Sequence, residues 1–414
     1  MSKILIHSIA FSPDGVSTAY LYNDIALRFR QEGYEVVVLT TTPQYNVVES
    51  ELIKQPLKKR LFGLYYESDF HGIKVKHVFQ KKHKKTTLRM FGFVYWHILS
   101  FFLGVSEKKV DVILSPSPPL TIGFINILIG KIKKAKVIYN IQEIYPDLLI
   151  EGGLKSKPII SILKWLESFV YKHSDAATTI DKVFYNTITS RFLDKTKLHI
   201  IPNFVDTDLY IPIAPETLQL DENIFPKTNA LKLMYAGNIG IAQDWKTLIE
   251  VAENTRDQNI EYFVIGEGAM KKILLEEKER LDLKKIHVLP YQCRELMPQL
   301  IAYSDLQFIF MTPEMDGNGF PSKAYTIMAC AKPLLVSSSE NTPIVNFLKD
   351  KECSKFFSQD NQSERIAQIT NYLQTVAKTE LNEMGLKGVY EIGNNYSKNT
   401  VTRQYVNLVN NLIQ

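Results

Sequence analysis

The feature that most constrains the fold is an alternation of short apolar runs with helical patterns, which occurs twice along the chain. In the first half, strand-like runs occupy residues 3–10, 35–40, 72–79, 110–117, 136–142, 175–180 and 198–203. Several of them are apolar on both faces, as the central strands of parallel sheets are. Helical patterns lie between them, at residues 17–32, 86–104, 119–133, 159–173 and 182–193. This order predicts a doubly wound parallel α/β sheet.

The pattern starts again near residue 231, with strand-like runs at 231–238, 262–268, 286–290, 306–311 and 333–338. Residues 201–220, rich in Pro, Asp and Asn, are typical of an interdomain linker. A chain of 414 residues also suits two cores better than one. We therefore expect two Rossmann-like domains facing a central cleft, each with a parallel sheet whose carboxyl edge binds a ligand. The predicted boundaries are 1–205, 206–395, and a C-terminal helix at 396–414 that could pack back on the first domain.

The net charge of +5 conceals an asymmetry between the two halves. Residues 1–205 contain 28 Lys and Arg against 17 Asp and Glu, whereas residues 206–414 contain 21 against 27. A basic first domain and an acidic second domain suggest two surfaces with different partners. The three cysteines form no metal-ligand pattern, and no secretory signal precedes the first strand. These observations predict a cytoplasmic protein without a structural metal.

Two glycine turns in the second half are candidates for an anion site. Gly237 and Gly240 follow the run 231–236, and Gly266 and Gly268 follow the next one. Glycine lets backbone N–H groups approach an anion closely, and a helix start favours negative charge. Both turns could equally be purely structural. The GxGxxG spacing of nicotinamide-binding proteins is absent.

The strongest candidate is the segment GNGFPSKAYTIMACAKP at residues 317–333. Pro321 and Ser322 suit the start of a helix, and Lys323 then falls in its first turn. A cation at that position is unfavourable by about 0.3–1 kcal/mol. A phosphate bound between the ammonium and the helix start would explain it. The alternative is a surface lysine on a structural helix.

The first half contributes three further candidates. Asp14 and Gly15 follow the first strand, with Ser17 and Thr18 opening the next helix, where a turn pair and a helix cap are the alternative interpretation. Glu143 ends the run 136–142 at its ligand-facing end, where a carboxylate could accept a proton from a hydroxyl or cap the next segment. The Asp-x-Asp at 206–208 resembles a metal motif, but its place in the linker favours a turn. We expect no catalytic metal.

Residues 74–89 carry seven Lys and Arg and no acid, and they lead into the apolar run MFGFVYWHILSFFLGV. This run is too short to cross a bilayer, which needs about 20 residues. Basic residues beside an aromatic-rich helix instead suit docking on anionic lipid, and residues 157–173 could add a second amphipathic surface. A core helix and a solvated loop are the alternatives. No nucleic-acid motif accompanies the charge. The predicted membrane-docking residues are Lys81, Lys82, Lys84, Lys85, Arg89, Phe91 and Trp96.

Together these motifs resemble family 4 of the GT-B glycosyltransferases over nearly the whole chain. The resemblance is carried by FSPDGVSTA, EGYEVVVLT, SPSPP, NIQEIYPDLL, IIPNFVDTDLY, YAGNIG, VIGEG and PSKAYTIMACAKP. The last motif is similar to the bacterial branch that builds O-antigen, capsule or colanic acid, including N-acetylfucosamine transferases. The resemblance implies that Lys323 neutralises a donor diphosphate beside Asn238 and Gly240, with Glu267 near the nucleoside. It also implies that Asp14 and Gly15 belong to a loop over the reaction centre.

Two departures from the family pattern concern the donor site. Asn318 and Thr326 stand where related enzymes often have two glutamates, which puts recognition of the donor hydroxyls in doubt. Ile239, Gln243 and Asp244 occupy the stretch where many members place Arg and Lys, so Lys323 would neutralise more of the phosphate charge. The expected donor site comprises Asn238, Gly240, Gln243, Glu267, Asn318, Ser322, Lys323, Tyr325 and Thr326, and the expected catalytic residues are Lys323, Glu143 and Asp14.

The resulting expectation is an enzyme that transfers a sugar, N-acetylated or deoxy, from a UDP-sugar to a polyprenyl-diphosphate-linked saccharide. Retention of the anomeric configuration is implied by the family alone. The enzyme would act at the inner face of the cell membrane. Two alternatives stay open: a non-hydrolysing UDP-sugar epimerase of the same fold, and a catalytically inactive membrane-bound scaffold, which the missing glutamates suggest.

Overall fold

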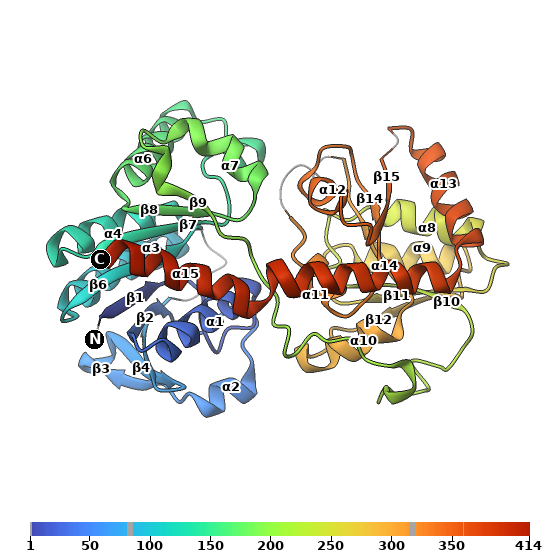
Figure 1. Ribbon diagram of the computed structural model, residues 1–414, viewed down its shortest axis with the longest axis horizontal. Coiled ribbons are helices and arrows are strands. Elements are labelled where there is room, and N and C mark those ends of the chain that lie inside the picture. The colour runs from blue at the N-terminus through green and yellow to red at the C-terminus, as the bar shows by residue number, and fades with distance from the viewer. Residues whose placement is uncertain (1, 81–85, 314–319, 359) are drawn as a thin grey trace. The chain divides into compact units, whose positions relative to one another are not determined.

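The computed structural model describes residues 2–80, 86–313, 320–358 and 360–414, with only the backbone for residues 86–89. The chain divides into two compact units (Figure 1). Unit 1 consists of Met1–Asn203 and Asn399–Gln414, and unit 2 of Phe204–Lys398. The chain therefore passes from one unit to the other twice.

Unit 1 is built on one sheet, in which the described residues form nine strands in the order β3-β4-β5-β2-β1-β6-β7-β8-β9. Every neighbouring pair is parallel except β3–β4 and β4–β5, which are antiparallel. The sequence interpretation missed β3 and β4, which form an antiparallel extension at one edge. The strands are β1 Lys3–His7, β2 Glu35–Thr41, β3 Lys58–Arg60, β4 Tyr65–Phe70, β5 Ile73–Val78, β6 Val110–Pro116, β7 Lys136–Ile141, β8 Ala176–Thr179 and β9 Leu198–Ile200.

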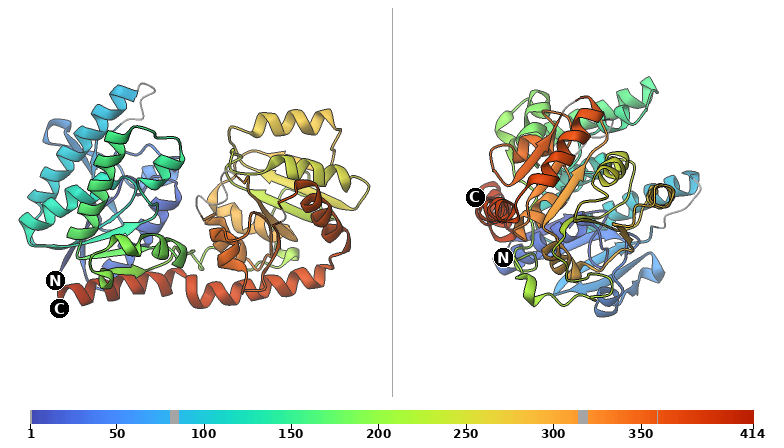
Figure 2. Two further views of the ribbon diagram at one scale, coloured as in Figure 1. Left: turned by 90° about the horizontal axis from the view of Figure 1, so that it is seen from above. Right: turned by 90° about the vertical axis from the view of Figure 1, so that its right-hand side faces the viewer.

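Helices cover both faces of this sheet (Figure 2). Successive strand residues point to opposite faces, and Tyr139 and Asn140 of β7 show the two layers. Tyr139 packs against α4 and α6, where a Cβ on Gly123 would lie 2.9 Å from its ring. Asn140 accepts a hydrogen bond from Tyr22 of α1 at 3.0 Å and donates one to Tyr405 of α15 at 3.1 Å. The helices are α1 Ser17–Gln31, α2 Glu49–Lys54, α3 Thr86–Ser106, α4 Leu120–Lys133, α5 Asp147–Glu151, α6 Lys157–His173, α7 Lys182–Ile188 and α15 Lys398–Ile413.

Unit 2 contains a wholly parallel sheet in the order β12-β11-β10-β13-β14-β15. Its strands are β10 Leu231–Ala236, β11 Ile260–Ile265, β12 Ile286–Leu289, β13 Leu306–Phe310, β14 Leu334–Ser337 and β15 Ser354–Phe357. Its helices are α8 Trp245–Asn254, α9 Lys271–Arg280, α10 Met297–Tyr303, α11 Lys323–Ala329, α12 Pro343–Leu348, α13 Gln362–Thr375 and α14 Lys378–Glu391.

Both sheets are doubly wound, and the predicted fold class is confirmed. In each sheet the strand order reverses beside the first strand of the unit, between β1 and β6 and between β10 and β13. Ligands of such folds bind at the carboxyl ends of the strands at this switch point. Most of the segment interpreted as a linker, from residue 204 onward, belongs to unit 2, where Val205 and Tyr210 are buried in an apolar cluster.

Candidate functional site

At the switch point of unit 2, the two glycine turns interlock. The N–H of Gly237 donates to the carbonyl of Ile265 at 2.9 Å, and that of Ile239 donates to the carbonyl of Glu267 at 2.9 Å. A Cβ on Gly266 would lie 1.9 Å from the carbonyl oxygen of Gly237, and one on Gly268 would lie 2.2 Å from that of Ile239. Gly266 also adopts φ +149°, which side chains rarely allow. Glycine is thus required at 266 and 268 by backbone packing.

Lys323 extends from the start of α11 over the first of these turns. Its Nζ lies 3.5 Å from the centroid of the Tyr235 ring. A Cβ on Gly237 would lie 2.8 Å from the same atom, so glycine at 237 makes room for the ammonium group. The Tyr235 ring is buried, and its hydroxyl donates to the carbonyl of Asn238 at 2.6 Å. The sequence interpretation did not single out Tyr235, although it lies in the YAGNIG motif.

The electrostatic environment of Lys323 is unusual for a lysine. Within the described ranges, which leave out residues 314–319, no carboxylate pairs with its ammonium and no hydrogen bond to it is found. Burial lowers the pKa of Lys323 from 10.5 to about 7, because the charged form loses its hydration. A cation beside a glycine turn, with no neutralising partner in the described part of the chain, provides a favourable environment for an anion.

The predicted donor-site residues near Lys323 differ in whether their hydrogen-bonding groups are free to contact a ligand. Ser322 is exposed, and its hydroxyl makes no capping bond because the residue is in the αR region rather than the extended one that capping requires. The Thr326 hydroxyl donates to the carbonyl of Lys323 at 2.8 Å. The contact between Tyr325 and the donor stays a prediction. The Tyr325 ring is buried among Phe320, Phe347 and Tyr396, since residues two apart on a helix point in different directions.

The other predicted donor residues lie on the two turns. Asn238 is exposed, whereas the N–H of Gly240 donates to the Gln243 side chain at 3.3 Å. The Glu267 carboxylate is paired with Lys271 at 2.6 Å. Asn318 lies outside the described residues. The structure therefore brings together Lys323, Asn238, Gly240 and Gln243 at one sheet edge.

In unit 1, Asp14 holds a turn. Its Oδ1 accepts hydrogen bonds from the N–H groups of Gln44 and Tyr45 at 2.8 and 2.9 Å, and its Oδ2 is buried without a partner among the described residues. Burial raises the pKa of Asp14 to about 6, against the opposing effect of these hydrogen bonds. A Cβ on Gly15 would lie 2.5 Å from the carbonyl oxygen of Asn46, so Gly15 is also fixed against this turn.

The predicted acceptor-loop residues open helix α1. Ser17 is exposed and Thr18 partly buried. Val16 occupies the N-cap position, so the alternative reading of Ser17 as a cap is wrong. The structure gives Asp14 and Gly15 a structural role, and a contact of these four residues with substrate stays a prediction.

Glu143 follows β7 at the carboxyl edge of the unit 1 sheet. Its backbone is held by Ser117, whose hydroxyl donates to the Glu143 carbonyl at 3.2 Å. Burial raises the pKa of the Glu143 carboxyl, and a hydrogen bond with Tyr145 partly offsets this effect. Tyr145 is correspondingly a weak acid, with its pKa raised to about 12 by burial and by Glu143. A partly buried carboxylate with a raised pKa at this edge is a candidate general base.

The Asp-x-Asp at 206–208 belongs to a structural ion pair. Lys398 donates to Asp206 at 2.6 Å and lies 2.8 Å from Asp208. Both carboxylates therefore have a structural role in unit 2.

The predicted membrane-docking residues have different positions. Lys81, Lys82, Lys84 and Lys85 lie outside the described residues, as does the side chain of Arg89. Phe91 is 74% exposed on α3. Trp96 is completely buried beside His7, Phe93 and His97, so its prediction is wrong: it lies on the inner face of α3, whose apolar pattern alone does not distinguish the two faces. No helix in the described part of the chain is both long and apolar enough to cross a membrane.

A comparison with known protein families matches a large part of unit 2. Residues 219–380 match the family described as "Glycosyl transferases group 1". This segment contains both glycine turns and Lys323. The chain is a glycosyltransferase.

Two relatives cover much of this glycosyltransferase. WcaI of Escherichia coli (strain K12), described as a putative colanic acid biosynthesis glycosyl transferase, is 20% identical over 351 residues, 83% of this chain and 84% of its own. WbjE of Pseudomonas aeruginosa, a probable glycosyltransferase, is 23% identical over 265 residues, 61% of this chain and 64% of its own. The crystal structure of Anabaena HepE with UDP has a TM-score of 0.72 at 13% identity, over 99% of this chain and 100% of HepE, and supports the GT-B fold.

Proposed function

We propose that this glycosyltransferase transfers a sugar from a UDP-sugar to a polyprenyl-diphosphate-linked saccharide, in the synthesis of a bacterial surface polysaccharide. The observation that carries the donor half is the ammonium of Lys323, which lies above the glycine turn at Gly237 and has no charged partner among the described residues. HepE was crystallised with UDP, which supports the same nucleotide for this chain. The relationship to WcaI supports the polysaccharide class.

In the proposed mechanism, the bond between the sugar C1 and the diphosphate oxygen breaks while the acceptor oxygen bonds to C1. Negative charge then develops on the departing diphosphate. Lys323 and the positive end of α11 stabilise it, which favours the transition state over the bound substrate. The acceptor oxygen bonds to C1 on the face from which the diphosphate departs, so the anomeric configuration is retained, and the acceptor hydroxyl loses its proton to Glu143. The scheme assigns no step to a metal ion, so EDTA should leave turnover unchanged.

Membrane association is the second part of the proposal. Several large apolar side chains are exposed on α3 and α6, among them Phe91, Ile98, Ile162 and Trp165. Helices α3, α4 and α6 contain a single acid, Glu167, which is buried and paired with Arg191 at 2.6 Å. Their exposed charges include Lys131, Lys157, Lys164 and Lys172. Apolar side chains with cations and no exposed carboxylate suit an anionic lipid surface at the cytoplasmic face.

The decisive experiment is a screen of UDP- and GDP-sugars for slow donor hydrolysis, with wild type and Lys323→Ala in parallel. We expect release of UDP from one UDP-sugar, reduced by at least about 100-fold in the variant. Near-normal hydrolysis by Lys323→Ala would refute the assignment of Lys323. Formation of a new UDP-sugar without acceptor would instead indicate an epimerase, and the absence of UDP binding would indicate an inactive scaffold.

A further inference from the structure

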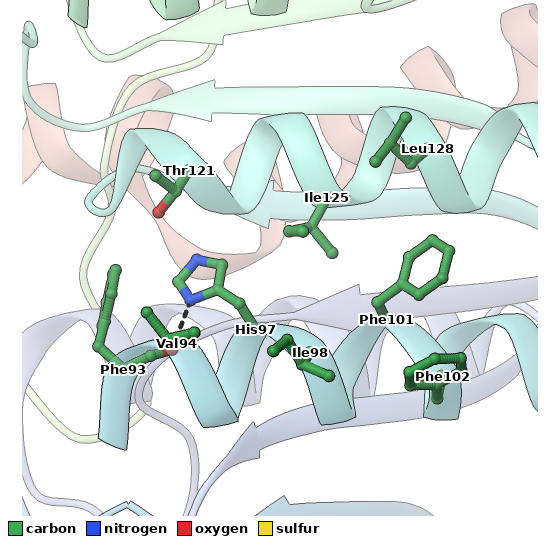
Figure 3. A pocket seen from close by; sticks show the side chains of 9 residues that line it. All are labelled: Phe93, Val94, His97, Ile98, Phe101, Phe102, Thr121, Ile125 and Leu128. Carbon is green, nitrogen blue, oxygen red and sulfur yellow. Dashed lines mark hydrogen bonds between the residues drawn. The ribbon is translucent and has the colours of Figure 1, made fainter. Parts of the chain in front are cut away.

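A groove of about 500 Å³ lies between α3 and α4 on the outer side of unit 1 (Figure 3). Its size falls within the range of small-ligand sites. The long walls are formed by side chains such as Ile98 and Phe102 from α3 and Ile125 and Leu128 from α4. Ile98 and Phe102 are 53% and 61% exposed, which leaves an open apolar surface between two packed helices.

The polar atoms of the lining residues do not face the groove. The Nδ1–H of His97 donates to the carbonyl of Phe93 at 2.8 Å, and its Nε2 is buried (Figure 3). Burial also lowers the pKa of His97, although its hydrogen bond to Phe93 acts in the opposite direction. The Thr121 hydroxyl is buried as well. The groove thus presents only hydrocarbon, and it offers no hydrogen bond to a sugar or an extended peptide, whose polar groups would be left unpaired.

One end of the groove lies at the carboxyl edge of the unit 1 sheet. Helices α3 and α4 each connect the carboxyl end of one parallel strand to the amino end of the next, so both begin at the carboxyl edge of the sheet. Thr121 lies at this end of the groove, and Leu128 lies toward the other. Ser117 and Glu143, which follow β6 and β7, belong to the same edge.

We propose that this groove binds the hydrocarbon tail of the lipid-linked acceptor, with the tail along α3 and α4 and the head group at the carboxyl edge. The absence of exposed carboxylates on α3, α4 and α6, described above, suits a lipid whose head is an anionic diphosphate. A hydrocarbon site follows from the groove alone. Its assignment to the acceptor rests on the proposed function.

The test uses farnesyl diphosphate below its micelle concentration, with pyrophosphate as the same head without a tail, and calorimetry on the full chain. Wild type should bind farnesyl diphosphate at least tenfold more tightly than pyrophosphate. Ile98→Trp adds bulk to the groove without losing apolar surface and should reduce this preference at least fivefold. Val94→Trp, also exposed in the groove, should act similarly. Ile53→Trp on α2 is the matched control, because Ile53 is 80% exposed and lies outside both the groove and the proposed lipid-facing helices, and this variant should bind like wild type.

Equal affinities of wild type for the two diphosphates would overturn the proposal, as would equal effects of Ile98→Trp and Ile53→Trp. Sedimentation showing a dimer that Ile98→Trp dissociates would also overturn it, because a second copy would then cover the groove. UDP binding is measured on the same samples. Failure of wild type to bind UDP would refute the donor site without affecting the farnesyl diphosphate result.

Discussion

Replacing Lys323 with Met should stabilise the free protein and weaken nucleotide binding at the same time. Methionine keeps the length of the side chain and removes its charge. The pKa of Lys323 lies near 7 in the folded protein instead of 10.5. At about 1.4 kcal/mol for each unit of pKa, the charged form of Lys323 is less favourable in the folded than in the unfolded protein by at most about 5 kcal/mol. Screening of this partly buried group and loss of the Tyr235 contact reduce the expected gain at pH 7 to about 2 kcal/mol.

The second effect of Lys323→Met concerns UDP. Loss of a charged hydrogen bond to the diphosphate should cost about 2–3 kcal/mol, which weakens binding roughly 30- to 150-fold. Thermal unfolding followed by circular dichroism gives the first quantity, and an increase in Tm of about 4 °C is expected for a unit of this size. Calorimetric titration with UDP gives the second.

Lys332→Met is the matched control. Lys332 is another partly buried lysine of unit 2 whose pKa is lowered by burial, but Asp305 acts in the opposite direction. Its removal should leave UDP binding unchanged and should raise Tm less than Lys323→Met does. A Lys323→Met protein with a lower Tm and an unchanged Kd for UDP would refute the reasoning about this site.

The remaining predictions concern residues near the carboxyl edges of the two sheets. UDP affinity should fall as pH rises above about 7, because Lys323 of the free protein then loses its proton, whereas Lys323 beside a bound diphosphate keeps it. Calorimetry at pH 8 in buffers of different ionisation enthalpy should therefore detect proton uptake on UDP binding. Binding without proton uptake would contradict the lowered pKa of Lys323. Gly266→Ala should destabilise unit 2 by at least about 2 kcal/mol in denaturant titrations, because its Cβ would overlap the carbonyl of Gly237, and a change under about 0.5 kcal/mol would argue against the interlocked turns. Glu143→Gln should lower kcat by about 100-fold or more while UDP still raises Tm, and unchanged turnover would exclude Glu143 as the base. Because burial raises the pKa of Asp14 from 3.8 to about 6, the protonated carboxyl stabilises the fold at low pH, and this stabilisation is lost as pH rises through about 6. Asp14→Asn should therefore be about 1–2 kcal/mol more stable than wild type at pH 8, with turnover retained. Loss of turnover would instead assign Asp14 to the reaction.

Much of the fold could be predicted from the sequence because it follows from local patterns. Strands buried on both faces are apolar throughout, and helices follow them at regular spacing, so the strands of both parallel sheets were predicted apart from a few at their edges. The missed strands β3, β4 and β15 are short or partly exposed edge elements, in which an apolar pattern is weak. Lys323 could also be identified, because a cation at a helix start is unfavourable without an anion.

Other features depended on contacts between residues far apart in the chain. The sequence places Trp96 and Phe91 in one apolar run, and only packing against His7 of β1 shows that Trp96 is internal. Tyr325 adjoins Lys323 in sequence, yet it belongs to a core cluster that includes Tyr396 from more than 70 residues away.

The sequence by itself determined the fold class and the positions of the glycine turns. Apolar residues indicate which strands are buried, and glycine marks positions that need unusual backbone freedom. Only the tertiary structure decided that Tyr235 lies beneath the ammonium of Lys323, that Asp14 holds the turn at 44–45, and that α3 and α4 leave a groove between them. These relations depend on which side chains meet across elements and how completely water is excluded from them. Periodicity along one segment does not contain that information.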